Sequence, residues 1–457
     1  MRGVVVLLVV AVLVGAAGSS RGHQAIQAAE GPTFVPKYFT QRLDHFDPLN
    51  TQTWKQLFYE DASKLREGGP IFFLLVPEAP MEFFFTSFPQ YYETWKLAQD
   101  NQGAFVALNH RYYGNNPPGA QEMTAENLRF LSVEQALEDY ITFADGLSAQ
   151  RGWKTNPWIV TGISYSGALA AYTRLKYPQK FVAAYASSGV VQAIEVLYQY
   201  GQAFVEAVSP ACYNPIASAI KYMDDGMDKP EIRAEMEAKF NPCGSLHDDD
   251  NFVRFLYQLS GDVIGSAQEA EQEEVCKFFV NGTDPVQSFA NFARDGLNET
   301  QCLDIFNIKD IQRTDWEYAS ANIRPWYWQK CSEFGYFKLA PPSGVSVVSR
   351  WNTLDLHLKW CEQIFQKPTA TLHPTADLIN ERYGGWDTKA TNIIFVNGGV
   401  DPWRKCSILQ PIPSQNIDAY VTTGAGHGAE TFPPKDTDPP QLKEARVRIQ
   451  KFLEQFF

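Results

Sequence analysis

The stretch Trp158-Ile-Val-Thr-Gly-Ile-Ser-Tyr-Ser-Gly-Ala-Leu-Ala-Ala-Tyr172 decides how this chain of 457 residues folds. An apolar strand runs into Gly162, and small residues after Ser164 open a helix. A sharp strand-to-helix turn holds such a serine in a strained conformation, so its neighbours must be small. The residue two positions after Ser164 is Ser166, so the pattern Gly-x-Ser-x-Gly is only partly met. We interpret Ser164 as a candidate nucleophile; the alternative is an ordinary turn with an incidental serine.

The segments around this turn alternate between short apolar runs and amphipathic stretches. Unbroken apolar runs are typical of parallel strands that are buried on both faces. Ser132 to Leu147 has helical spacing of its apolar residues, and Ser132 with Gln135 resembles a capping box. The rhythm predicts an α/β fold. The predicted strands are Ile71–Val76, Ala104–Leu108, Trp158–Thr161, Phe181–Ala186, Asn392–Asn397 and Asp418–Thr422.

The middle of the chain differs from both ends. Strand signals fade after about residue 195, and charged helical segments such as Lys229–Phe240 and Gln268–Phe279 dominate. Five of the seven cysteines lie there, which indicates a mostly helical insertion stapled by disulfides. The α/β pattern returns after about residue 385 and ends in the amphipathic helix Leu442–Phe457. We therefore predict an α/β core at 34–194 and 346–457, split by a helical cap at 195–345.

The N-terminus predicts entry into the secretory pathway. Arg2 precedes the apolar run Val4 to Ala17 and small residues follow, which is the pattern of a signal peptide at 1–20. Fourteen apolar residues are short for a membrane span, and we expect no membrane anchor. Asn281-Gly-Thr and Asn298-Glu-Thr are glycosylation sequons and should be exposed.

Charge and cysteine spacing exclude several classes of function. The formal net charge is −13 and basic runs are absent, which argues against nucleic acid as a partner. There is no Cys-x-x-Cys pair, so we expect no zinc site and no cofactor. Six of the seven cysteines could form three bridges in an oxidising compartment, but the sequence alone does not fix their pairing.

Two residues near the C-terminus complete the predicted chemistry. Asp401 follows an apolar strand in Asn397-Gly-Gly-Val-Asp-Pro-Trp403, and His427 lies in the loop Thr423-Gly-Ala-Gly-His-Gly-Ala. The order Ser164, Asp401, His427 is that of the α/β-hydrolase fold. His427 would take the Ser164 proton and pass it to the leaving group, while Asp401 orients the imidazole. The Tyr165 backbone N–H would stabilise an oxyanion.

Six motifs are spread along the chain: Gln41-Arg-Leu-Asp-His-Phe-Asp47, Asn109-His-Arg-Tyr-Tyr-Gly114, Leu128-Arg-Phe-Leu-Ser132, Ser164-Tyr-Ser-Gly-Ala-Leu-Ala-Ala171, Cys331-Ser-Glu-Phe-Gly-Tyr-Phe337 and Asn397-Gly-Gly-Val-Asp-Pro-Trp403. Together they resemble one family of serine peptidases, which includes lysosomal Pro-X carboxypeptidase, dipeptidyl peptidase II and thymus-specific serine protease. The resemblance runs from about residue 38 to the end and looks nearest to the thymus-specific branch. It implies the same nucleophile, acid and base.

The resemblance implies further properties. The substrate would be a peptide with proline beside the scissile bond, held by an apolar and aromatic pocket in which Trp403 is the stronger candidate and Tyr336 the weaker; either ring could instead pack the core. Relatives in this family are often dimers, so a homodimer is an open expectation. The implied disulfides are Cys212–Cys276, Cys243–Cys302 and Cys331–Cys361, with Cys406 free.

One departure from the family concerns the loop after the first core strand. The family usually has Gly-Gly-Glu-Gly where this chain has Val76-Pro77-Glu78-Ala79. This loop often supplies the second oxyanion donor, and Pro77 has no N–H. Losing one donor typically costs about 100- to 1000-fold in turnover, whereas nothing is lost if the Glu78 N–H donates. The Glu78 side chain could contact a substrate's amino terminus or make a loop hydrogen bond.

We expect a secreted or lysosomal serine-type peptidase, proline-directed and acting as an exopeptidase, with carboxypeptidase and dipeptidyl-peptidase action both open. A second hypothesis is another secreted serine hydrolase, either an esterase or a serine carboxypeptidase of the other large family. That family has Glu before its serine-tyrosine pair, where this chain has Ile163. A third hypothesis is a catalytically weakened binding glycoprotein.

Overall fold

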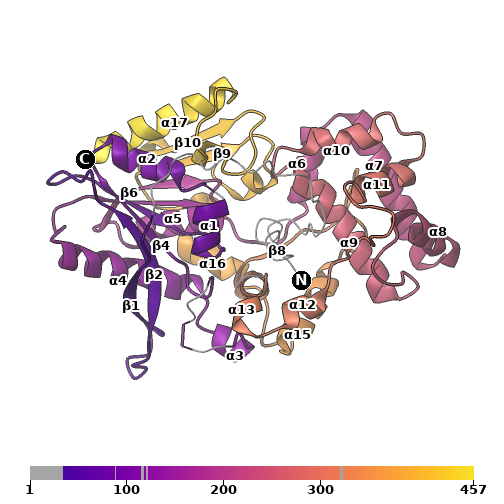
Figure 1. The fold of residues 1–457 in the computed structure, drawn as a ribbon, viewed down its shortest axis with the longest axis horizontal. Coiled ribbons are helices and arrows are strands. Elements are labelled where there is room, and N and C mark those ends of the chain that lie inside the picture. Colours follow the sequence, from indigo (N-terminus) through magenta and orange to yellow (C-terminus); the bar gives the residue numbers. More distant parts are fainter. Residues whose placement is uncertain (1–33, 88, 115–117, 120–121, 320–322) are drawn as a thin grey trace.

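A computed structural model describes residues 34–457 except 88, 115–117, 120–121 and 320–322 (Figure 1). The predicted signal peptide lies outside the described residues. One mixed sheet forms the centre of the α/β part. Its strands are β1 (Lys37–Arg42), β2 (Thr53–Asp61), β3 (Ile71–Leu75), β4 (Ala104–Leu108), β5 (Trp158–Ile163), β6 (Phe181–Ser187), β9 (Ile393–Gly398) and β10 (Ile417–Thr422).

The strand order is β1-β2-β4-β3-β5-β6-β9-β10. β2 is antiparallel to both of its neighbours, and all strands from β4 to β10 run parallel. This is the α/β-hydrolase fold, and the predicted fold class is confirmed. All six predicted core strands occur; Ala104–Leu108 has the predicted bounds, and the ends of the other five differ by one or two residues. β1 and β2 escaped prediction because polar residues interrupt them, so they lack the long apolar runs of the other strands.

Two apolar layers cover the sheet because successive strand residues point to opposite faces. Phe73 and Leu75 pack on one side, with α4 and α5, and Phe72 and Leu74 pack on the other, with α1, α2 and α17. These helices are α1 (Met81–Ser87), α2 (Tyr92–Asp100), α4 (Val133–Arg151), α5 (Tyr165–Lys176) and α17 (Pro440–Leu453).

The start of α4 matches half of the predicted capping box. The Ser132 hydroxyl accepts a hydrogen bond from the Gln135 N–H at 3.3 Å. The Gln135 side chain, however, does not return to Ser132. It donates to Asp44 and accepts from the His45 N–H, so it ties the helix to the segment after β1.

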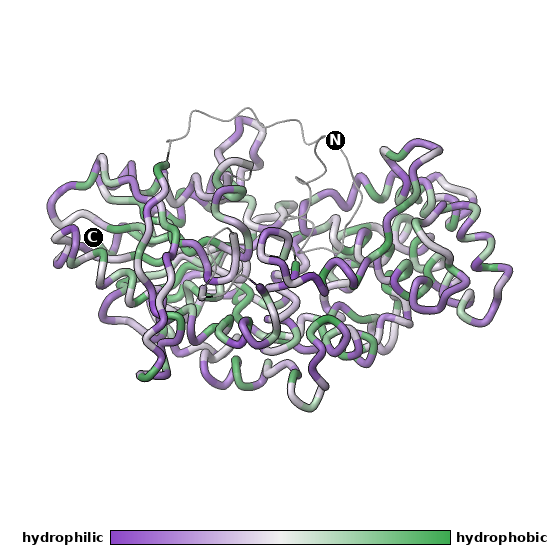
Figure 2. Tube along the Cα trace, turned by 60° about the horizontal axis from the view of Figure 1, so that its bottom comes forward, coloured by the Kyte–Doolittle hydropathy of each residue, from purple (hydrophilic) through white to green (hydrophobic). Residues whose placement is uncertain are grey.

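A helical body lies beside the sheet in Figure 1 and is drawn in magenta to orange. Figure 2 colours long parts of the central strands green, whereas the helices of this body alternate between purple and green, as expected for amphipathic helices. Its helices are α6 (Gln199–Ala207), α7 (Pro210–Asp224), α8 (Pro230–Phe240), α9 (Asp249–Ser266), α10 (Gln272–Phe279) and α11 (Pro285–Ala293).

The remaining elements connect the two bodies. β7 (Ile194–Val196) pairs with β8 (Gly335–Phe337), so the start and end of the insertion lie side by side. Sheet strands resume only at Ile393; the boundaries at 194 and 346 stay a prediction. The connecting helices are α3 (Ala125–Leu128), α12 (Ile308–Gln312), α13 (Trp316–Ala319), α14 (Arg324–Gln329), α15 (Leu354–Phe365) and α16 (Ala376–Tyr383).

Covalent links and exposed sites agree with the sequence analysis. The structure contains the bridges Cys212–Cys276, Cys243–Cys302 and Cys331–Cys361, while Cys406 is free and buried. Asn281 and Asn298 are both exposed. Among the described residues, no helix has the length and apolar character that a membrane crossing requires.

Candidate active site

Ser164 forms the tip of a tight turn between β5 and α5. Its backbone has φ 62° and ψ −126°, a region that residues other than glycine rarely occupy. The Ser164 N–H donates to the Ser187 carbonyl of β6 at 2.9 Å. The neighbouring strand therefore holds the strained turn in place.

Two neighbours explain how the turn closes. A Cβ atom at Gly162 would lie 2.0 Å from the Ser166 carbonyl oxygen, so only glycine fits there. The Ser166 hydroxyl donates to the Ile163 carbonyl and accepts from the Ile163 N–H, both at 2.9 Å. Ser166 thus stabilises the turn from the position where the sequence pattern has glycine.

Asp401 and His427 form a buried pair at the same edge of the sheet. The His427 Nδ1 lies 2.7 Å from the Asp401 Oδ2, and Asp401 is fully buried. The Asp401 Oδ1 accepts a second hydrogen bond, from the Trp403 N–H at 3.0 Å. A Cβ at Gly398 would meet the Gly426 carbonyl oxygen at 2.1 Å, so this glycine allows the two loops to touch.

The His427 loop reaches the Ser164 turn. The Gly428 N–H donates to the Ser188 hydroxyl at 3.0 Å, and a Cβ at Gly428 would lie 2.9 Å from the Ile163 side chain. The buried Nε2 of His427 has no hydrogen-bond partner among the described residues, Ser164 included. The structure therefore pairs Asp401 with the Nδ1 of His427, while the Nε2 of His427 has no hydrogen-bond partner among the described residues.

The surroundings of His427 favour its charged form. Burial by itself lowers the pKa of the imidazole, but the Asp401 carboxylate outweighs it, and Glu269 and Glu78 add to the effect, so the pKa is raised. An opposite charge within about 4–6 Å acts in this direction. The site is thus prepared to stabilise an imidazolium.

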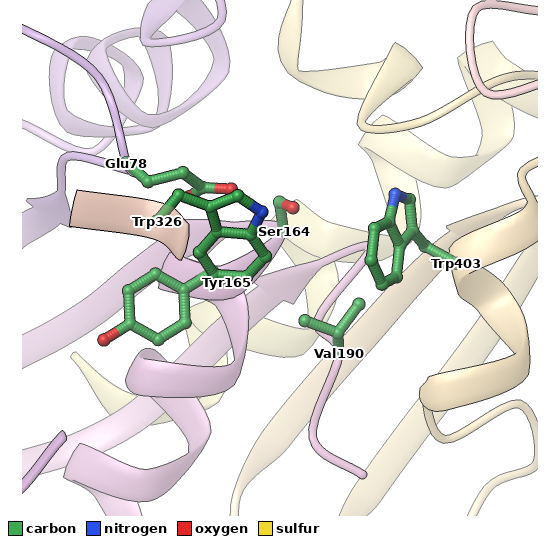
Figure 3. A pocket seen from close by; sticks show the side chains of 6 residues that line it. All are labelled: Glu78, Ser164, Tyr165, Val190, Trp326 and Trp403. Atoms are coloured by element: carbon green, nitrogen blue, oxygen red, sulfur yellow. The ribbon is translucent and has the colours of Figure 1, made fainter. Parts of the chain in front are cut away.

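Ser164 lines a small pocket that is too narrow for a water molecule in this structure, and its two sides differ (Figure 3). Glu78, Trp326 and the Tyr165 ring lie to one side of Ser164 in this view, and Val190 and Trp403 lie to the other. All six residues line the same pocket. One side therefore carries a carboxyl group, and the other is apolar.

Of the two predicted pocket aromatics, only Trp403 lines this pocket. Tyr336 packs edge-on against Trp403 with ring centres 5.3 Å apart. The Tyr336 hydroxyl donates to backbone carbonyls of Val190 and Gln192, at 3.0 and 3.2 Å. Tyr336 thus supports the wall of the pocket from behind.

Tyr165 and Glu78, the two residues predicted as oxyanion donors, line the same pocket. Tyr165 is the first residue of α5, where a backbone N–H has no partner within the helix. On the loop after β3, the Ala79 N–H donates to the Pro77 carbonyl at 2.7 Å, and the Glu78 N–H has no carbonyl partner among the described residues. Of this loop, Glu78 and not Pro77 lines the pocket.

The helical body contributes a residue that sequence reasoning missed. Gln268 follows α9, and its backbone carbonyl accepts from the His427 N–H at 2.8 Å. Its side-chain oxygen accepts from the Trp403 Nε1 and the Tyr200 hydroxyl, both at 2.9 Å.

The predicted helix Gln268–Phe279 was wrong at its start, since α10 begins at Gln272 and Gln268 lies in the preceding turn. Trp326 and Val190 were also missed, as no local motif marks them.

A hydrogen-bond network of three residues, His110, Gln329 and Tyr113, holds the Tyr165 side chain. Its hydroxyl accepts from Gln329 at 2.7 Å and lies 3.2 Å from the His110 Nε2. The Gln329 side-chain oxygen in turn accepts from Tyr113 at 2.6 Å. The Asn109–Gly114 motif therefore supports the turn from the side of the core.

The same motif anchors the sheet to α4. Arg111 makes two hydrogen bonds of 2.7 Å to Asp139, and both side chains are buried. His45, from the first motif, also contacts Asp139 at 2.8 Å. Within the described part of the chain, no cluster of three His, Cys, Asp or Glu residues could hold a metal ion.

Comparison with known proteins agrees with this geometry. The family model described as serine carboxypeptidase S28 matches residues 41–449. The probable serine protease EDA2 of Arabidopsis thaliana is 31% identical over 429 residues, which cover 90% of this chain and 84% of that protein. The human thymus-specific serine protease is 26% identical and the mouse protein 25%, each with 95% of this chain and 90% of the relative covered. The chain belongs to the serine carboxypeptidase S28 family of serine-type peptidases.

Proposed function

We propose that this protein hydrolyses peptide bonds next to proline through an acyl-enzyme formed on Ser164. The observation that carries the proposal is the meeting of three chain-distant loops at one sheet edge. These loops present a strained serine, a buried Asp401–His427 pair and a pocket that contains the serine.

In the proposed reaction, His427 Nε2 takes the Ser164 proton as Oγ attacks the scissile carbonyl carbon. The carbon–nitrogen bond then breaks, and the imidazolium gives its proton to the leaving amine. Water hydrolyses the ester by the same steps, which frees Ser164. The unpartnered Nε2 suits this role, and catalytic hydrogen bonds often tighten only when substrate is bound.

The backbone N–H groups of Tyr165 and Glu78 are the proposed oxyanion donors. Neither is used by a backbone carbonyl among the described residues. Donors that are fixed before the reaction stabilise the developing charge without reorganisation.

Trp403 and Val190 are proposed to hold the proline ring. They form the apolar side of the pocket, and Gln268 and Tyr336 fix the position of the Trp403 indole. A rigid aromatic wall suits a compact ring that carries no polar side-chain group.

We also propose that the protein works in the extracellular space or the lysosome as an exopeptidase. The three disulfides are typical of proteins that fold in an oxidising compartment. The exposed Asn281 and Asn298 are accessible to glycosylation.

A labelling and cleavage experiment tests the function. The purified protein is treated with a fluorophosphonate probe and assayed at acidic pH with X-Pro and Pro-X peptides. We expect labelling at Ser164 and cleavage beside proline, and Ser164→Ala should abolish labelling and lower turnover by about 10⁶-fold.

Three results would contradict the proposal. Equal activity of the Ser164→Ala variant would remove the nucleophile. Labelling with cleavage of esters but of no peptide would favour the esterase hypothesis. Absence of labelling would favour a binding glycoprotein.

A further inference from the structure

Glu78 is a buried carboxyl group without a partner. It is only 6% exposed. Neither of its side-chain oxygens has a hydrogen-bond partner among the described residues, and the neighbouring His427 pairs with Asp401 instead. Buried charges are normally paired, so an unsatisfied carboxyl in a pocket needs an explanation.

The burial of the Glu78 carboxyl group shifts its pKa. Burial raises the pKa of Glu78 to about 7. Its own backbone N–H, which lies close to the carboxyl group without meeting the geometry of a hydrogen bond, and His427 oppose this rise less strongly. Bringing a cation to the carboxylate would compensate the lost hydration.

The position of Glu78 indicates where a cation from outside would bind. Glu78 and Ser164 line the same pocket, with the Trp326 and Tyr165 rings beside them. Aromatic faces and a carboxylate together form a favourable environment for an ammonium group. A cation at this place would stand close to the scissile bond, opposite the apolar side that we assign to proline.

We propose that Glu78 binds the free α-ammonium group of a peptide substrate, within two residues of the scissile bond. The protein is then an exopeptidase that acts from the amino terminus and releases one or two residues. This inference rests on the proposed function and assigns the substrate class of the same site. The Glu78 carboxylate sets the distance from the amino terminus to Ser164, and its backbone N–H serves the oxyanion.

Matched substrates test the assignment. Ala-Pro-aminomethylcoumarin and Pro-aminomethylcoumarin are each compared with their N-acetylated forms, and a peptide with a blocked amino terminus and a free C-terminal carboxylate after Pro-Phe is added. For one of the two pairs, we expect the wild-type protein to favour the free amine by about 100-fold in kcat/KM, since removing one partner of a desolvated ion pair costs this much or more. The C-terminally free peptide should be the poorest substrate.

Variants assign the preference to the side chain. In Glu78→Gln, the ratio of free to acetylated substrate should fall to near one, because the amide keeps the shape and the backbone N–H but loses the charge. Glu78→Asp keeps the charge and should keep part of the preference. Glu67→Gln, on an exposed loop before β3, is the control and should keep the full ratio.

The outcomes separate this proposal from the proposed function. A wild-type protein that is labelled by the fluorophosphonate but cleaves acetylated and free substrates equally would overturn only the role of Glu78. The same holds if the C-terminally free peptide is the best substrate, or if Glu78→Gln keeps the wild-type ratio. A protein that is not labelled at all would overturn the proposed function itself.

Discussion

Two loops at the same edge of the sheet carry buried carboxyl groups in opposite conditions. Asp401, after β9, accepts from His427 and from the Trp403 N–H, so both of its oxygens are occupied. Glu78, after β3, has two buried oxygens and no partner for either among the described residues. Both loops follow strands of the same sheet, but among the described residues the protein provides hydrogen-bond partners only for the Asp401 carboxyl group.

This difference indicates two different roles. A carboxylate with fixed hydrogen bonds holds its neighbour in one orientation, as a catalytic aspartate must. A carboxyl without partners makes the folded state less stable and becomes useful only when a ligand completes it. The comparison predicts that Asp401 acts on every substrate, whereas Glu78 distinguishes among substrates.

The largest expected effect is that of Asp401→Asn. An amide donates where the carboxylate accepts, so His427 takes the wrong tautomer, and turnover should fall by about 10⁴-fold. The loss should be equal for free and acetylated Ala-Pro-aminomethylcoumarin, measured as kcat. Asp418→Asn, on β10 and paired with Arg448 at the surface, serves as the control. If Asp401→Asn lowered kcat only for the substrate with the free amine, the proposed difference between the roles of Asp401 and Glu78 would be wrong.

The next effect concerns stability and comes from Glu78→Gln. The pKa of Glu78 is raised from near 4.5 to about 7 on folding, so the folded state binds more protons than the unfolded state between these values. Wild-type stability therefore falls as pH rises through this window, by up to about 3 kcal/mol. Glu78→Gln has no carboxyl group to titrate at this position. The difference in free energy of unfolding, variant minus wild type, should therefore increase by about 3 kcal/mol between pH 4.5 and 8.

Denaturant unfolding at several pH values measures this gain. Glu67→Gln should show a constant difference from the wild type over the same range, because Glu67 is exposed. A flat difference for Glu78→Gln would mean that its carboxyl group is satisfied in the folded protein, and the contrast with Asp401 would disappear.

The smallest effect is expected from Glu269→Gln. The Glu269 side chain is partly exposed, but many protein atoms surround it, and this desolvation raises its pKa to about 7. Its negative charge in turn contributes to the raised pKa of His427. Removing its charge lowers the pKa of His427, so the neutral base persists to lower pH. The acidic limb of kcat/KM should therefore move to lower pH, and only slightly, since solvent screens the pair.

The pH profile of kcat/KM for Ala-Pro-aminomethylcoumarin measures this shift, with the exposed Glu273→Gln as the matched control. A limb that moves upward would show that Glu269 does not act on His427 through its charge.

Much of the fold could be predicted because it depends on local patterns. The apolar runs at Ile71, Ala104 and Trp158 are long enough to require burial on both faces, which only a covered parallel sheet provides. Gly162 and the small residues after Ser164 likewise follow from the steric demands of the turn. The order of Ser164, Asp401 and His427 along the chain predicts the candidate site without further information.

The tertiary structure alone decided what surrounds these residues. Gln268 looked like part of a charged helix, but it lies in a turn whose carbonyl and amide bind His427 and Trp403. Tyr336 resembled a pocket residue, but its hydroxyl is bound to the backbone behind Trp403. The state of Glu78 also became visible only in the fold, because burial and missing partners arise from segments that are distant in the chain. Local periodicity encodes strands and turns, whereas the satisfaction of a polar group depends on every segment that packs around it.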